Sequence, residues 1–138
     1  AYGGSAGWSE AIYTLEKSLA QRPASKTVLL DWGMATQLRL LSSDRLPLLE
    51  ATQPEGTAYD ARYLEPYIRN PRVVWVKHAE GERPAFPQIV QAFQARLEQL
   101  EYQSEIVENV RDRRGRPVYE ILAVRPAPAR DTPAAPAR

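Results

Sequence analysis

The sequence predicts an α/β protein, a three-layer α/β/α sandwich whose mainly parallel sheet ends in a C-terminal antiparallel hairpin. Along most of the chain, short and strongly apolar runs alternate with stretches of helical periodicity, which is typical of parallel strands covered by helices. The last part alternates apolar and polar residues on both sides of a basic turn, as hairpins do. A length of 138 residues suits one domain.

The predicted domain spans residues 9–125 as a single unit. A glycine-rich lead-in over residues 1–8 precedes it, and a proline- and alanine-rich tail over residues 126–138 follows it. The sequence starts without methionine. Two interpretations are therefore open: the chain is a processed product, or it is a fragment of a longer protein.

The first half contains four predicted elements. Ser9 is a good N-cap for a helix over residues 9–20, whose apolar residues recur at helical spacing. The apolar run at 27–30 predicts a buried central strand, and a helix is expected over 34–42. The apolar run at 46–51 contains a proline near its start, so it is expected to form a short or edge strand.

The second half begins with a kinked or two-piece helix over residues 58–69, because a proline lies inside it. A buried strand is expected at 73–76 and an amphipathic helix at 86–101. Two strands, at 104–110 and 118–124, form the expected hairpin.

Composition excludes several classes of function. A net charge of +1 argues against a nucleic-acid-binding protein, which needs a basic surface. The absence of cysteine removes disulfides, thiolate catalysis and zinc–thiolate sites. No run approaches the roughly 18 apolar residues of a membrane span, so we expect the isolated chain to be soluble.

The stretch Asp31-Trp32-Gly33 follows the central strand, at the end of the strand where open α/β sheets bind ligands. Asp31 can bind a sugar hydroxyl or accept a proton, but capping the next helix, with Gly33 permitting the turn, is the more common role. Trp32 can stack on a sugar or simply pack. A dinucleotide or methyltransferase loop is disfavoured because no further glycine follows directly.

His78, the single histidine, follows the second buried strand. It meets Asp31 if the two strands are neighbours, whereas the alternative is a partly exposed histidine that bonds a loop carbonyl. No nucleophile motif and no metal-ligand spacing accompany it, so we predict no catalytic residue, no metal and no cofactor. The predicted ligand-binding residues at this edge are Asp31, Trp32, Gly33, Gln37 and His78.

The hairpin turn is strongly basic. Its arginines can contact phosphate or lipid headgroups, or they can be solvated and protect the sheet edge from aggregation. The residues concerned are Arg111, Arg113, Arg114 and Arg116.

Several stretches together resemble one family of domains. They are a helix that begins near Trp8-Ser9, the strand ending in Val28-Leu29-Leu30-Asp31-Trp32-Gly33, then Gln37-Leu38, Leu40-Leu41-Ser42 and Arg45. This combination resembles the soluble domain after the last membrane helix of some bacterial polytopic glycosyltransferases, which are similar to the dolichyl-phosphate-mannose protein mannosyltransferase family.

In that family, sugar transfer from a polyprenyl-phosphate donor depends on acidic residues of the membrane part, which this chain lacks. The resemblance therefore implies an accessory domain, not catalytic on its own, at the extracytoplasmic (periplasmic) face of the inner membrane. Its implied partners are the membrane portion of the same polypeptide and a lipid-linked sugar or acceptor, with no nucleic acid. The alternatives are a stand-alone α/β protein that binds a nucleotide or sugar at the strand ends, and a scaffold without a ligand.

Overall fold

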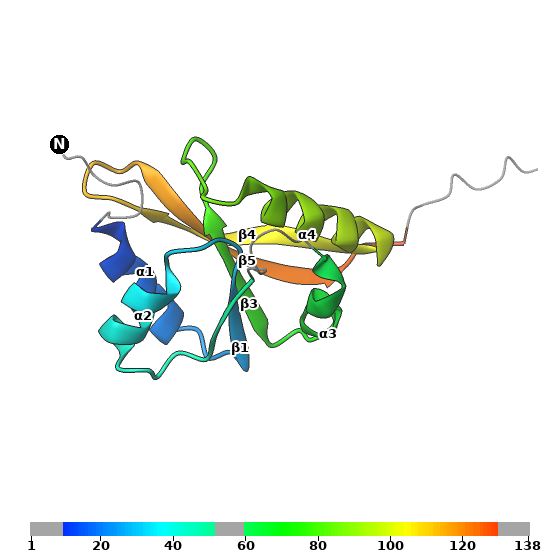
Figure 1. Cartoon of the computed structure of the whole chain (residues 1–138), viewed down its shortest axis with the longest axis horizontal. Helices are drawn as coiled ribbons and strands as arrows, with labels where there is room; N and C mark the ends of the chain where they lie inside the picture. Colours follow the sequence, from blue (N-terminus) through cyan, green and yellow to red (C-terminus); the bar gives the residue numbers. More distant parts are fainter. Residues whose placement is uncertain (1–9, 52–59, 130–138) are drawn as a thin grey trace, which may run out of the picture.

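The computed structural model describes residues 10–51 and 60–129. This part of the chain has a mixed α/β fold around one open five-stranded sheet (Figure 1). The helices are α1 (Ala11–Ala20), α2 (Ala35–Ser42), the 3-10 helix η1 (Ala61–Leu64), α3 (Glu65–Ile68) and α4 (Pro87–Gln99). The strands are β1 (Lys26–Leu29), β2 (Leu48–Glu50), β3 (Val73–His78), β4 (Tyr102–Arg111) and β5 (Pro117–Pro126).

The predicted α/β class and the order of the elements are confirmed in the described residues. Ser9, the expected N-cap of the first helix, the lead-in 1–8 and the tail from residue 130 lie outside them. The helix expected at 58–69 is in two pieces, as its proline requires: Pro66 lies in the first turn of α3, where no backbone N–H is needed.

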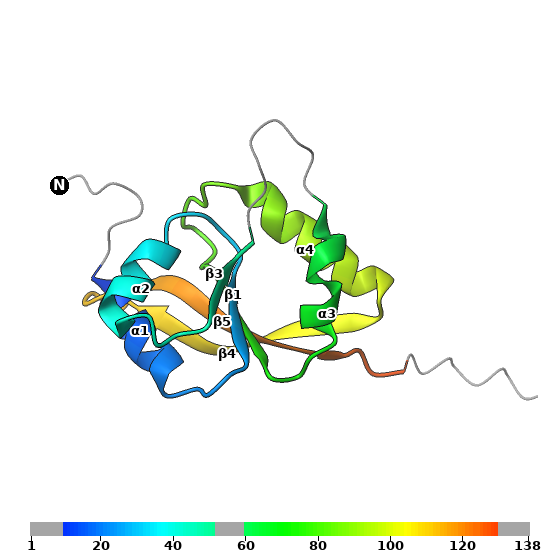
Figure 2. The same ribbon diagram turned by 60° about the horizontal axis from the view of Figure 1, so that its bottom comes forward.

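The strand order is β2-β1-β3-β5-β4. Figure 2 shows the sheet between α1 and α2 on one side and α3 and α4 on the other. Strand β1 pairs in parallel with β2 and β3, whereas β5 is antiparallel to both β3 and β4. The prediction of a mainly parallel sheet is therefore not confirmed for the described strands, since half of the pairings are antiparallel. The hairpin joins the sheet through its second strand, which gives β5 two neighbours and leaves β4 at the edge.

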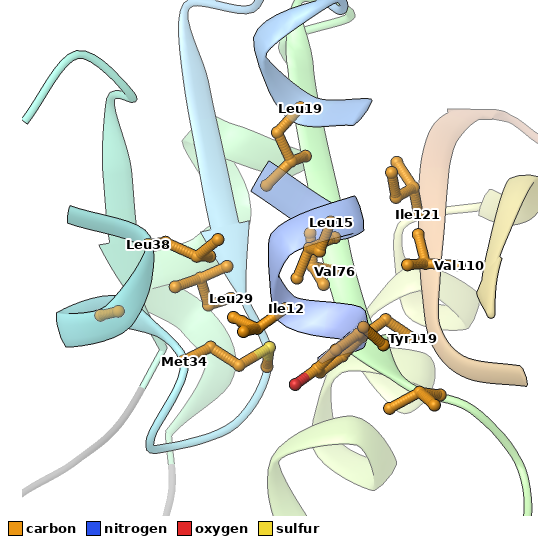
Figure 3. Close-up of a cluster of buried hydrophobic side chains, with 13 residues drawn as sticks. Ile12, Leu15, Leu19, Leu29, Met34, Leu38, Val76, Val110, Tyr119 and Ile121 are labelled. Carbon is orange, nitrogen blue, oxygen red and sulfur yellow. The ribbon is translucent and has the colours of Figure 1, made fainter. Parts of the chain in front are cut away.

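Alternate residues of the inner strands face opposite sides of the sheet and pack into two hydrophobic clusters. In the first cluster, Leu29 of β1 and Val76 of β3 pack with apolar residues of α1 and α2 (Figure 3). In the second, Val28 and Trp75 pack with residues of η1, α3 and α4. Both views show α1 and α2 on one side of the sheet and α3 and α4 on the other.

Several segments that are distant in sequence meet at one end of the molecule. Helix α1 starts beside the hairpin turn, because the backbone N–H of Arg113 donates to Glu10 Oε1 at 3.0 Å. His78, at the end of β3, pairs with Tyr119 close to the start of β5. We call this region the carboxyl end: it comprises the start of α1, residues 30–34 after β1, residues 79–86 after β3, and the hairpin turn 112–116.

Candidate functional site

Asp31 lies at the centre of the carboxyl end and is enclosed by donors from the protein. Its Oδ1 accepts the backbone N–H groups of Trp32 at 2.8 Å and Phe86 at 2.9 Å. Its Oδ2 accepts the backbone N–H of Ala85 at 2.7 Å and lies 3.1 Å from His78 Nε2. The residue is 1% exposed, so its carboxylate holds the segment before α4 against the end of β1.

The charge of Asp31 is stabilised by these contacts. Burial alone would raise the pKa of the Asp31 carboxyl, but the hydrogen bond with His78 and those from the backbone of Trp32, Ala85 and Phe86 lower it below the usual value. The group is therefore ionised at neutral pH, and both of its oxygens are occupied.

The sequence suggested that Asp31 caps the helix after Gly33, and this expectation is wrong. Helix α2 has Met34 at its N-cap position and no side-chain cap. Gly33 has a φ of 102°, a backbone conformation that L side chains rarely adopt. The turn directs the backbone N–H of Gly33 to Glu50 Oε2, at 3.2 Å, so Asp31 binds the segment before α4 instead.

His78 lies beside Asp31, as expected for neighbouring strands. Its side chain is 9% exposed and its Nε2 lies on Asp31, so the alternative of a histidine that bonds a loop carbonyl is wrong. The His78 and Tyr119 ring centroids are 5.4 Å apart. His78 Nδ1 is buried and has no hydrogen-bond partner in the described part of the chain, so Nε2 is the nitrogen that holds Asp31.

Trp32 has the opposite environment to Asp31, because its side chain is 62% exposed. Packing, the common role for such a tryptophan, does not explain it. Its backbone N–H is held by Asp31 and the next N–H by Glu50, so a fixed turn presents an open indole. Whether this indole binds a ligand stays a prediction.

Gln37 forms no hydrogen bond or ion pair with the residues above in the described part of the chain. It lies on α2, and its Oε1 is buried without a hydrogen-bond partner among the described residues. The predicted ligand-binding set is thus divided: Asp31 and His78 form a buried pair, while Trp32 and Gly33 form an adjacent surface turn.

The four arginines of the hairpin are exposed but differ in their partners. Arg116 is paired with Glu82 and Asp112. The guanidinium of Arg111 donates to Gly115 O at 2.9 Å. The backbone N–H groups of Arg113 and Arg114 bind Glu10 and Asp112, and no ion pair of their side chains occurs within the described ranges.

Sequence reasoning missed Glu50, which ends β2 at the carboxyl end and holds Gly33. It also missed the pair of Lys77 and Glu120, whose Nζ and Oε1 atoms are 2.9 Å apart across β3 and β5 with side chains 20% and 11% exposed. The signal for Glu50 was available, since the parallel strand beside β1 also ends in an acidic residue. Lys77 and Glu120 required the strand order, which no local pattern gives.

Few reactions are possible at this site, because its polar side chains are enclosed by the protein. The Asp31 oxygens are occupied by protein donors, and burial raises the pKa of the Tyr119 hydroxyl to about 12, with a further contribution from Glu82. Tyr119 therefore stays protonated at neutral pH. Among the described residues, no group of three or more potential ligands is arranged to hold a metal ion. The predicted site residues that solvent and a ligand can reach are Trp32 and the hairpin arginines.

Comparison with protein-family models, with curated proteins and with solved structures finds no match to this chain. Within residues 10–51 and 60–129, none of the helices has the length and hydrophobicity needed to cross a membrane.

Proposed function

We propose that this chain is an accessory domain of a membrane glycosyltransferase that uses a polyprenyl-phosphate sugar donor, at the extracytoplasmic (periplasmic) face of the inner membrane. In this proposal the membrane portion of the same polypeptide performs the transfer. The present domain positions that portion, the lipid-linked sugar or the acceptor. Helices on both sides of the sheet support the interpretation of the fold as a three-layer α/β/α sandwich.

The observation that carries the proposal is the contrast within Asp31-Trp32-Gly33, the most distinctive stretch of the family resemblance. The acid is 1% exposed and bound by protein donors, whereas the indole beside it is 62% exposed on a fixed turn. A catalytic acid or base must reach a substrate proton, and Asp31 is enclosed. An exposed indole on a fixed turn instead supports a role in binding a partner, with no catalytic step at this residue.

The gene that encodes the chain provides the first test. We expect the reading frame upstream of residue 1 to encode several apolar segments of about 20 residues each. A frame with no such segment would rule out the proposal.

Activity of the longer protein provides the second test. Transfer of the lipid-linked sugar should be lost or reduced when residues 9–125 are deleted, while the isolated chain should have no transfer activity. Activity of the isolated chain would contradict an accessory role.

A second candidate function, binding of a sugar or nucleotide at the strand ends, is favoured by the position of Glu50 beside the Trp32 turn. An aromatic face next to a carboxylate is a common arrangement for stacking a sugar or base and bonding its hydroxyls. Calorimetric titration with sugar phosphates, nucleotides and S-adenosylmethionine tests it. Binding should be lost in Trp32→Ala and kept in Leu40→Ala, a matched control because Leu40 is 76% exposed on α2. No heat with any ligand would contradict this candidate.

A further inference from the structure

Three exposed aromatic residues lie in the segments that form the carboxyl end. Trp32 is 62% exposed in the turn after β1, Tyr13 is 57% exposed at the start of α1, and Phe86 is 39% exposed just before α4. These residues belong to three separate elements that only the fold brings to one end. The other large hydrophobic residues exposed in the described ranges lie on α2, η1 and β4: Leu40, Tyr63, Ile106 and Val107.

The same end carries exposed arginines that form no ion pair with the described residues. Arg111, Arg113 and Arg114 are exposed on the hairpin and form no ion pair within the described ranges. A hollow of about 350 Å³ lies between the start of α1 and the hairpin and is lined by Tyr13, Arg111 and Arg113, among others. An aromatic side chain therefore lines the same hollow as two exposed arginines.

We propose that the carboxyl end lies against an anionic lipid bilayer, with Trp32, Tyr13 and Phe86 at the headgroup level and the hairpin arginines on lipid phosphates. Tryptophan and tyrosine are enriched at membrane–water interfaces, because a ring with one polar atom suits that layer. Basic residues close to the surface are attracted by anionic lipids, and guanidinium groups bind phosphate oxygens in pairs. The inference rests on the proposed function, which attaches the domain to a membrane part.

Acidic groups at this end define where the lipid phosphates bind. Glu10 and Asp112 also line the hollow. The pKa of each is lowered, that of Glu10 chiefly by the backbone N–H of Arg113 and that of Asp112 chiefly by the backbone N–H of Arg116. Both are therefore charged at neutral pH and repel an anion inside the hollow. The phosphates consequently bind the outward guanidinium groups on the rim.

Tryptophan quenching tests the orientation directly. The full chain, with Trp8→Phe and an N-terminal histidine tag, is attached to vesicles that contain nickel-chelating lipid and brominated lipid. The attachment gives the chain a high effective concentration at the vesicle surface, so that weak contacts with lipid are detected. Of the two remaining tryptophans, Trp75 is 0% exposed, so quenching reports on Trp32. We expect stronger quenching on phosphatidylglycerol vesicles than on phosphatidylcholine vesicles.

Arginine variants distinguish quenching caused by contact of the carboxyl end with lipid from quenching caused by the tag attachment alone. Replacing Arg111, Arg113 and Arg114 with Gln should reduce the quenching on anionic vesicles to the value on neutral ones. Arg72→Gln, at an exposed arginine just before β3, should leave it unchanged. For the untagged chain, vesicle affinity should fall about fivefold for each arginine removed. Circular dichroism verifies that each variant is folded.

Equal quenching on both kinds of vesicle, or no effect of the triple arginine variant, would overturn the proposal. Its failure differs from failure of the proposed function: upstream membrane segments can exist although the carboxyl end faces away from the bilayer. If the gene encodes no such segments, the proposed function is wrong, whereas a measured contact with vesicles still stands.

Discussion

Two adjacent residues, Asp31 and Trp32, have opposite environments: the first is buried and the second is exposed. The Asp31 carboxylate accepts three backbone N–H groups and contacts His78, whereas the Trp32 side chain is mostly in solvent. The acid fixes the turn, and the turn presents the indole. Substitution of Asp31 should therefore change stability, while substitution of Trp32 should change recognition.

Replacement of Asp31 by Asn should destabilise the protein by about 1–3 kcal/mol at pH 7, because its buried donors lose a charged acceptor. The pKa of Asp31 is lowered in the folded state, so its contribution is complete above the unfolded value near 3.9 and is lost as the pH falls through the folded value. Urea unfolding should show the same difference from the wild type at pH 7 and at pH 5, and a smaller difference at pH 3.

Asp44→Asn is the matched control, since Asp44 is exposed and its side chain has no hydrogen bond within the described ranges. It should change stability little at any pH. A difference for Asp31→Asn that stays constant down to pH 3 would contradict a contribution from the ionised carboxylate.

From the sequence, a contact between Asp31 and His78 was expected only if the two buried strands that precede them were neighbours, and the structure shows that they are. The sequence did not predict that Ala85 and Phe86 supply the N–H groups for Asp31. Those groups lie in the irregular segment before α4, whose path depends on tertiary contacts and leaves no periodic pattern. The expected cap of α2 was wrong for a related reason, since the turn at Gly33 is held by Glu50 from another strand.

At the scale of elements, α1 is held against the hairpin turn at its start and against β4 at its end. Glu10 accepts the backbone N–H of Arg113 near the hairpin turn. At the other end, Glu108 Oε2 accepts the hydroxyl of Ser18 at 2.6 Å, and Oε1 accepts Arg22 Nη2 at 3.0 Å. These polar contacts set the direction of the helix along an edge strand.

Ser18→Ala and Glu108→Gln test this attachment as a double-mutant cycle. The coupling between the two residues should be about 0.5–1.5 kcal/mol, the range for one hydrogen bond. The Glu108 side chain is 32% exposed, which favours the lower part of that range. The measurement is the unfolding free energy of the wild type, both single variants and the double variant. Additive effects would show that the contact contributes nothing.

Strand β5 explains why the sheet is less parallel than expected. Its residues 118–122 are buried without interruption, the pattern of a strand with neighbours on both sides and helices on both faces. In the sequence, Glu120 interrupts the apolar run and suggests a two-sided hairpin strand. Burial of Glu120 is possible because Lys77 of β3 pairs with it, and that partner is 43 residues away in the chain.

At the scale of the whole molecule, the two hydrophobic clusters share one sheet. Neighbouring residues of β1, Val28 and Leu29, belong to different clusters, and so do Trp75 and Val76 of β3. Neither cluster can lose its strands without disturbing the other. We therefore expect the domain to unfold in one cooperative transition.

Matched substitutions in the two clusters test this cooperativity. Leu38→Ala in the first and Leu97→Ala in the second each remove a buried side chain and should destabilise by about 2–5 kcal/mol. In both variants, made in a chain with Trp8 and Trp32 replaced by Phe, unfolding followed by the fluorescence of Trp75 in the second cluster should coincide with unfolding followed by far-ultraviolet circular dichroism. Two separated transitions would mean that the clusters are independent.

The position of β5 between β3 and β4 also has a consequence for folding during synthesis. Until residues 117–126 have been made, β3 lacks a neighbour on one side and β4 has none at all in the order observed. Sheet completion depends on contacts between β3 and β5 that are distant in sequence, and such contacts form slowly. A nascent chain is therefore exposed to mispairing and aggregation until its last strand emerges.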